Sequence, residues 1–154
     1  MTIAAIASAI ATIANGTTAT VNTVTLTITG IDPPPAQLST AQLPAAYVLA
    51  GEGTLEWGSD YGTETRDYKL QCAVEGLEQS TRETKESWIR ALIVALRDKF
   101  AGYPNLGAAG VQNALVTGDT GALEIQDSPS KSYVGFEMTI NVTELIARTY
   151  ATGE

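Results

Sequence analysis

Residues 132–145, SYVGFEMTINVTEL, carry the strongest structural signal in the chain and decide its fold. Apolar side chains occupy every second position, and polar side chains stand between them. A period of two is that of a β-strand with one face in a core and the other in solvent. The predicted inward residues are Val134, Phe136, Met138, Ile140 and Val142, and the outward ones are Glu137, Thr139, Asn141 and Thr143.

Two earlier segments predict a β-hairpin. Residues 64–77, ETRDYKLQCAVEGL, alternate in the same way, with Tyr68, Leu70, Cys72 and Val74 on the buried face. Residues 45–59, AAYVLAGEGTLEWGS, predict a preceding strand whose glycines at 51–53 mark a bulge. The turn sequence GSDYG at 58–62 joins the two strands.

The remaining strand signals are shorter. Residues 20–29, TVNTVTLTIT, predict one strand in which Val24, Leu26 and Ile28 alternate with threonines. Residues 111–117, VQNALVT, and 122–126, ALEIQ, predict two strands. The sequence GDTG between them is a hairpin signal, so we expect these two strands to pair with each other.

Two segments have helical periodicity. After Thr2 as a cap, a stripe of Ile3, Ile6, Ile10 and Ile13 predicts a first helix, which ends at Asn15 and Gly16 and has no charged side chain. An outer helix face without charged side chains suggests that another subunit covers it. Residues 81–100 predict a second helix, with Ser80 and Glu83 as a capping box. Its core stripe is Trp88, Ile89, Leu92, Ile93, Leu96 and Phe100.

These elements follow the order α-β-β-β-α-β-β-β. The order predicts an α+β fold in which two helices pack on a mostly antiparallel β-sheet. A chain of 154 residues is the size of one domain, so we expect a single domain over residues 1–154.

Composition narrows the classes of function. The formal charge is −8, and no Lys or Arg precedes Arg66. This balance argues against a protein that grips nucleic acid by its phosphates. The apolar N-terminus lacks the basic start of a signal peptide and is too short to span a bilayer. We therefore expect a cytoplasmic chain without a membrane segment, and the single Cys72 fits a reducing compartment.

The sequence offers little for catalysis. It contains no histidine, which removes the usual nucleophile systems and common metal ligand sets. Cys72 lies on the apolar face of its strand, as expected for an inert thiol. Glu52 and Glu56 would lie roughly 13 Å apart along a strand, beyond the carboxylate spacing of glycosidases. We expect no enzyme, no cofactor and no metal site. Trp57 and Tyr61, near the hairpin turn, are candidate interface aromatics, with local packing as the alternative.

Residues 32–49, DPPPAQLSTAQLPAAYVL, form an unusually long and stiff connection. One interpretation is a surface crossover between strands. The other is a docking loop that projects with a defined shape, for which Pro33, Pro34, Pro35, Gln37 and Leu38 are the candidate residues.

The ordered pieces LPAAYVLAGEG, TRDYKLQCAVEG, ESWIRALIVALRDKFAGYPNLG and SYVGFEMTINVTEL resemble the tail terminator proteins of long-tailed bacteriophages, also called tail completion proteins. The resemblance covers nearly the whole chain, and no single motif carries it. It implies a structural protein of the virion tail or neck, assembled in the cytoplasm of the bacterial host. It also implies a homo-oligomeric ring, usually a hexamer, that stops growth of the tail tube.

The resemblance implies partners as well. The ring would contact the tail tube protein and present a docking surface to the head completion or connector protein, and DNA would pass through its lumen without specific binding. Glu124, Glu137 and Glu144 are candidate lumen-facing acids, taken as outward residues of the last strands. The alternatives are another neck component, such as a head completion or adaptor protein, a tail tube subunit, or a small acidic carbohydrate-binding or hydrolase module.

Overall fold

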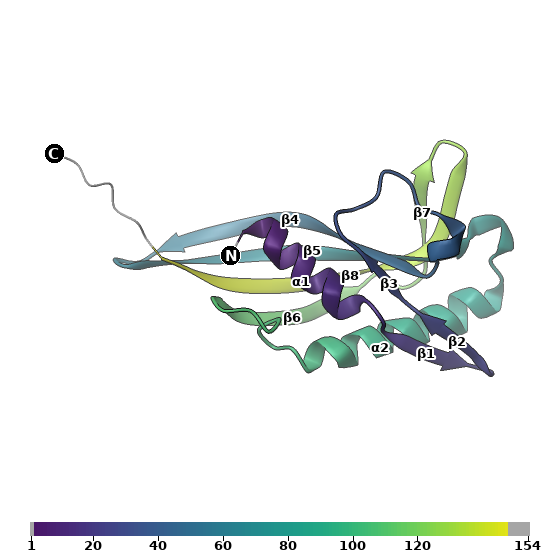
Figure 1. Cartoon of the computed structure of the whole chain (residues 1–154), viewed down its shortest axis with the longest axis horizontal. Coiled ribbons are helices and arrows are strands. Elements are labelled where there is room, and N and C mark those ends of the chain that lie inside the picture. Colours follow the sequence, from purple (N-terminus) through teal and green to yellow (C-terminus); the bar gives the residue numbers. More distant parts are fainter. Residues whose placement is uncertain (1, 148–154) are drawn as a thin grey trace.

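The computed structural model describes residues 2–147, which form two helices and a large antiparallel sheet (Figure 1). The α+β fold class and the order of helical and strand regions are confirmed. The elements are α1 (Ile3–Ala14), β1 (Thr18–Val21), β2 (Val24–Thr27), β3 (Thr29–Ile31), β4 (Ala45–Trp57), β5 (Tyr61–Gly76), α2 (Ile89–Ala101), β6 (Val111–Asp119), β7 (Leu123–Ser128) and β8 (Lys131–Ala147). Short 3₁₀ turns occupy Thr40–Gln42 and Leu77–Gln79.

Strand β8 is the central strand of the main sheet, whose order is β3-β4-β5-β8-β6. It pairs with β5 along almost its whole length, from Tyr133 to Ala147. Every pairing in this sheet is antiparallel except that of β3 with β4. The five predicted inward side chains of β8 are each 2% exposed or less, so the period-two prediction is confirmed.

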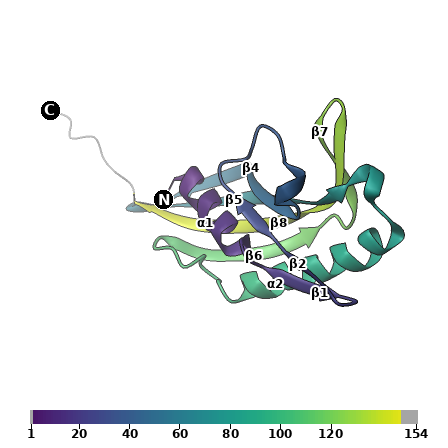
Figure 2. The same ribbon diagram turned by 45° about the vertical axis from the view of Figure 1, so that its right-hand side comes forward.

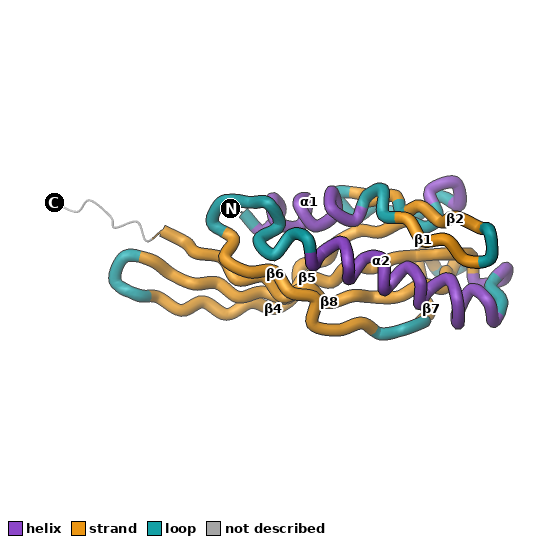
Figure 3. The backbone as a smooth tube through the Cα atoms, turned by 90° about the horizontal axis from the view of Figure 1, so that it is seen from below, coloured by secondary structure: helices purple, strands orange, loops and turns teal. Residues whose placement is uncertain are grey.

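The main core lies between one face of this sheet and the two helices, and Figure 3 shows the layers edge-on. The sheet contributes alternate residues of β4, β5 and β8, including the predicted Tyr68, Leu70, Cys72 and Val74. Helix α2 contributes Ile89, Leu92, Ile93, Leu96 and Phe100. Trp88 is only half-buried at the edge of this core. Ile3 is 42% exposed, so it lies outside the core although the sequence predicted it in the buried stripe of α1.

The interpretation of residues 20–29 as one strand is wrong. Asn22 and Thr23 have φ values of 49° and 73° and form a tight two-residue turn between β1 and β2. Positive φ at both central residues matches the right-handed twist of a hairpin. The resulting two-stranded sheet is separate from the main one and contacts α2, and the chain then enters the main sheet through β3.

The expected hairpin between 111–117 and 122–126 is also wrong. Strands β6 and β7 both pair with β8, one after the other along the same edge. The GDTG segment instead makes a bulge between them. The Thr120 amide donates to the Glu137 carbonyl at 3.0 Å, and the Glu137 amide donates to Thr120 Oγ1 at 3.0 Å. The threonine hydroxyl thus replaces a backbone acceptor at this point of the ladder.

The second helix begins one residue later than the predicted capping box. The Thr84 amide donates to Thr81 Oγ1 at 3.3 Å, and the Thr81 amide donates to Thr84 Oγ1 at 3.4 Å. Thr84 Oγ1 also donates to Glu75 Oε2 at 2.6 Å, which ties the helix start to β5. After the helical residues Arg82 and Glu83, Thr84–Trp88 form a π-helical turn that continues into α2.

Gly30 in β3 allows α1 to lie close to the sheet. A Cβ atom at this position would collide with the Ala11 carbonyl oxygen of α1. The Gly30 amide also donates to Asn15 Oδ1 at 3.0 Å, just beyond the end of the helix. The position of α1 over β3 and β4 therefore depends on the absence of a side chain here.

We predict that Gly30→Ala lowers the free energy of unfolding by about 1–3 kcal/mol, because α1 must shift to admit the methyl group. Gly118→Ala is the matched control, since a Cβ atom there meets no atom within 4 Å. Urea unfolding followed by circular dichroism measures both. Equal stability of the two variants would contradict this account of the helix packing.

Candidate assembly surfaces

The face of the sheet that points away from the helices carries a row-by-row array of polar side chains. We call it the open face. It comprises alternate residues of neighbouring strands: Tyr47, Leu49, Thr65, Asp67, Lys69, Gln71, Glu137, Thr139, Asn141 and Thr143. The registers place them in cross-strand rows, so the residues of each row are side-chain neighbours.

Hydrogen bonds link the side chains of these rows. The Tyr47 hydroxyl donates to Gln71 Oε1 at 2.8 Å, and Gln71 Nε2 donates to Glu137 Oε2 at 2.9 Å. This row crosses three strands. Burial raises the pKa of Tyr47, and the nearby carboxylates of Asp127 and Glu137 add to the effect. Tyr47 therefore stays a neutral hydrogen-bond donor.

The next two rows continue the pattern. Lys69 Nζ donates to Thr139 Oγ1 at 2.7 Å, and Asn141 Nδ2 donates to Asp67 Oδ1 at 2.9 Å. The groups on the open face are thus held by one another, and cross-strand pairs of this kind contribute about 0.2–1 kcal/mol each. The result is a surface of interlinked side chains in which one cation, Lys69, stands among two acids, Asp67 and Glu137, and neutral polar groups.

Beyond the helices the sheet narrows to a projecting ribbon, which we call the arm (residues 51–66 and 142–147; Figures 1 and 2). The predicted bulge lies at its root, where the β4–β5 register shifts between Ala50 and Gly53. Trp57 and Tyr61 flank its turn and are 51% and 53% exposed. The Trp57 ring packs over Gly62, its cross-strand partner, so local packing and an exposed aromatic surface coexist at this site.

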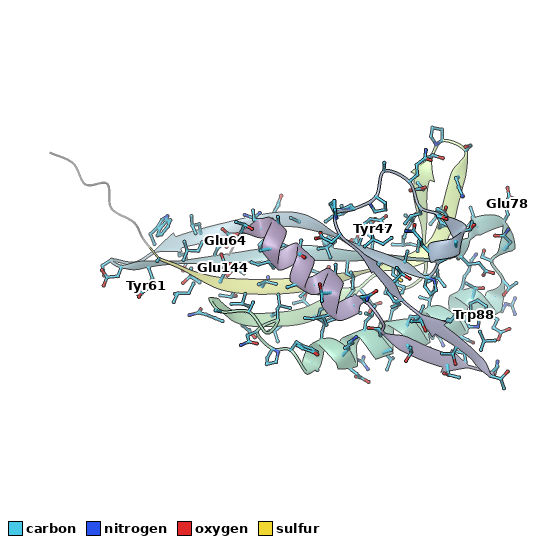
Figure 4. The ribbon with its side chains drawn as sticks, in the orientation of Figure 1. Tyr47, Tyr61, Glu64, Glu78, Trp88 and Glu144 are labelled. Carbon is cyan, nitrogen blue, oxygen red and sulfur yellow. The ribbon has the colours of Figure 1, made fainter. Side chains whose placement is uncertain are left out.

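Arg66 fixes the root of the arm. Its Nη1 donates to the Gly51 carbonyl in the bulge at 2.8 Å, and its Nε pairs with Glu64 Oε1 at 2.9 Å. Glu144 lies opposite Glu64 on β8, as Figure 4 shows, and is only 4% exposed. The prediction that Glu144 faces outward is wrong, because it has the same parity as Val142 and Ile140 and points to the helix side.

The three candidate lumen acids do not come together. Glu137 lies on the open face in the Tyr47–Gln71 row. Glu124 is exposed at the other end of the sheet, beside Leu77 and Lys85 in a surface cleft on the helix side. With Glu144 buried, Glu137 is the single one of the three whose position suits a polar wall formed by the open face.

The proline-rich connection folds back on the sheet. Leu38 is 4% exposed and packs with Ala45, Ala73, Ile125 and Tyr133 in a second, smaller core on the open-face side. The Leu38 amide donates to Asp127 Oδ2 at 2.9 Å, and the Tyr133 hydroxyl donates to the Leu38 carbonyl at 3.1 Å. Leu38 is therefore an anchor of the loop, and its assignment as a docking residue is wrong.

The rest of the loop is accessible. Pro33, Pro34 and Gln37 are exposed, and Pro35 is half-buried. The length of the connection follows from the parallel pairing of β3 with β4, because parallel neighbours need a crossover rather than a tight turn. The crossover interpretation accounts for the length, while the exposed prolines still offer a surface on the connection between β3 and β4.

Sites for chemistry are sparse in the described part of the chain. Among residues 2–147, no three His, Cys, Asp or Glu side chains gather closely enough to hold a metal ion. Cys72 is fully buried, and burial raises the pKa of its thiol. Neither helix within these residues has the length and apolar character needed to cross a membrane.

A scan against protein-family models finds no match for the chain, and a search of curated proteins finds no similar sequence. The surfaces must therefore be interpreted from their own chemistry. Sequence reasoning proposed Trp57, Tyr61 and Glu137 as candidates, which stay predictions, and it missed the linked rows of the open face. These rows could have been predicted by comparing the outward-facing residues of neighbouring strands with one another.

We predict that Leu38→Ala destabilises the chain by at least about 2 kcal/mol, because it empties the centre of the second core. Gln37→Ala, a change at the exposed neighbouring position, should leave the thermal midpoint unchanged. Differential scanning calorimetry measures both. If Leu38→Ala is as stable as Gln37→Ala, the loop is not anchored as described.

Tyr68 provides a pH-dependent test of the main core. Its side chain is fully buried, and its hydroxyl has no hydrogen-bond partner among the described residues. Burial raises its pKa to about 12, while Arg66 lowers it and Glu64 and Glu144 raise it. The folded state therefore holds this proton more tightly than the unfolded state, and stability is lost as pH rises from about 10 through about 12.

We predict that Tyr68→Phe is neutral or stabilising by up to about 1 kcal/mol at pH 7, because it removes an unpaired buried hydroxyl. Its stability should also fall less steeply than that of the parent above pH 10. Urea unfolding at a series of pH values measures both effects. A large loss of stability at pH 7 would mean that the hydroxyl has a partner.

Proposed function

We propose that the chain is a structural subunit of the tail-terminator type, forming a homo-oligomeric ring at the end of a bacteriophage tail tube. In this proposal the open face lines the lumen, and the helices lie outside. The ring stops tube growth and presents a surface to the head connector. The protein would belong to the virion tail or neck and have no catalytic role.

The open face is the observation that carries this proposal. Its polar side chains are bonded to one another across the strands, as in the row Tyr47, Gln71 and Glu137. A wall of this kind offers passing DNA few unpaired donors and little positive charge. Acidic or neutral walls avoid the phosphate binding that basic ones produce, so DNA would move through without specific binding.

Two other surfaces are easier to explain in a subunit of an oligomer than in an isolated domain. Helix α1 carries no charged side chain, and Ile3 on its first turn remains 42% exposed. The arm exposes Trp57 and Tyr61, and aromatic residues of this kind are common anchors of interfaces. Burial of these side chains between copies would remove apolar surface from water.

We predict that the purified chain, added to growing tail tubes, ends them with a single ring at the head-proximal end and restores joining to heads. Negative-stain electron microscopy measures the ring and the tube length. A Trp57→Ala, Tyr61→Ala variant should lose this activity if the arm contacts a partner. Gln126→Ala, a change at an exposed position of β7 outside the proposed surfaces, is the folded control.

Other images would contradict the proposal. Incorporation of the chain along the whole length of a tube would make it a tube subunit. A ring bound to the portal without any effect on tube length would make it an adaptor or head completion protein. A species that stays strictly monomeric and never caps tubes would exclude a ring altogether.

A further inference from the structure

The positive charge of this acidic chain is concentrated on one helix. Residues 82–99 hold five Lys or Arg residues against three acids, whereas the rest of the chain holds four against fourteen. The five are Arg82, Lys85, Arg90, Arg97 and Lys99. The start of α2 and its outer face are therefore the one stretch suited to receive an acidic partner.

The outer face of α2 has a defined pattern. Arg90, Val94 and Arg97 follow at helical spacing, so they form one outward stripe with the apolar residue between the two guanidinium groups. Val94 is 43% exposed. Beside it lies a shallow groove between α2 and the β1–β2 hairpin, lined by Ala19, Thr20, Ala91 and Ala95.

The ion pairs already present leave these arginines accessible. Arg90 Nη2 is 2.7 Å from Glu86 Oε2, with the Arg90 side chain 75% exposed. Arg97 Nε is 3.9 Å from Asp98 Oδ1, with the Arg97 side chain 59% exposed. Exposed pairs of this kind contribute little to stability, so a partner carboxylate can compete for both cations.

The arm carries the complementary pattern. Residues 51–65 contain four acids and no Lys or Arg. At the tip, the half-exposed Trp57 pairs with Gly62 and stands on the helix-side face of the ribbon, Glu56 points to the opposite face, and Asp60 lies in the turn. An acidic tip with an exposed aromatic ring is complementary to α2, where the exposed Val94 lies between Arg90 and Arg97.

We propose that the arm of one copy docks on α2 of the next copy. Trp57 lies against Val94 and the alanine-lined groove, and Glu56 and Asp60 supply the negative charge of the arm tip that attracts Arg90 and Arg97. The arm tip and α2 lie well apart within one chain in all three ribbon and tube views, so the contact joins two copies (Figures 1, 2 and 3). The inference rests on the proposed ring.

Such a contact has a consequence for assembly. The arm and α2 are different surfaces of the same chain, so the interface is heterologous, with each copy using its arm on one neighbour and its α2 on the other. Heterologous interfaces close into rings when the rotation between copies allows it. The contact therefore supplies a head-to-tail link of the kind that a ring requires.

A charge-swap experiment tests the contact. We expect Arg90→Glu with Arg97→Glu, or Glu56→Lys with Asp60→Lys, to raise the concentration needed for assembly at least about tenfold, because like charges then meet. The chain with all four substitutions should assemble again. Lys131→Glu with Glu124→Lys, which changes charges outside both surfaces, is the matched control and should assemble as the parent does. Light scattering with size-exclusion chromatography measures the species, and circular dichroism checks folding.

Cross-linking gives an independent measurement. An equimolar mixture of the Trp57→Cys and Val94→Cys variants should form a disulfide-linked dimer on mild oxidation, whereas the parent should not, because its Cys72 is buried. A Gln37→Cys variant replaces the arm cysteine as the control and should not cross-link to Val94→Cys.

The outcomes separate this contact from the proposed function. If rings still cap tubes and the folded charge-reversal variants assemble like the parent, the contact is wrong and the function stands. If the four-substitution chain is folded but does not assemble, charge complementarity between these surfaces is wrong. If the α2 variant instead loses binding to a fluorescent DNA duplex while assembly is unchanged, α2 meets nucleic acid. A chain that never assembles and never caps tubes overturns both proposals.

Discussion

The fold depends on the pairing of β8 with the strands on both its edges. Its alternate residues from Val134 to Val142 join residues of β4 and β5 on the sheet side of the main core, and Tyr133 packs in the second core. Gly135 lies in β8 next to the residues that enter the two cores, and a Cβ atom there would collide with the Cys72 carbonyl oxygen on β5. One strand therefore aligns both cores, and a register slip in it would turn both sets of side chains to the wrong face.

The parallel pairing of β3 with β4 is the second constraint. It forces a long crossover, and the crossover is stabilised because Leu38 enters the second core and bonds to Asp127 and Tyr133. This end of the open face is thereby covered, while the rest stays accessible along β5 and β8. The loop thus covers one end of the sheet, and the arm at the other end is uncovered.

Much of the fold could be predicted because its signals are local. Period-two alternation identified β5 and β8, glycines marked the bulge of β4, and helical spacing identified α1 and α2. What could not be predicted depends on contacts distant in sequence. Leu38 lies 89 residues from Asp127, so no local pattern indicates its burial. The Asn22–Thr23 turn lacks the glycine that usually marks such hairpins, and the GDTG segment forms a bulge because β8 pairs with both flanking strands.

The candidate surfaces likewise include features that the local sequence predicts and features that depend on strand pairing. The exposed aromatic residues could be predicted because they lie at a predicted turn. The burial of Glu144 on the helix side and the position of Glu137 on the open face became clear only from the register of β8.

A cryo-electron microscopy map of the ring at a tail end tests the central claim most directly. We expect the helices on the outside and the row of Tyr47, Gln71 and Glu137 facing the channel. A map with the helices toward the axis, or with the chain absent from the tail end, would contradict the account.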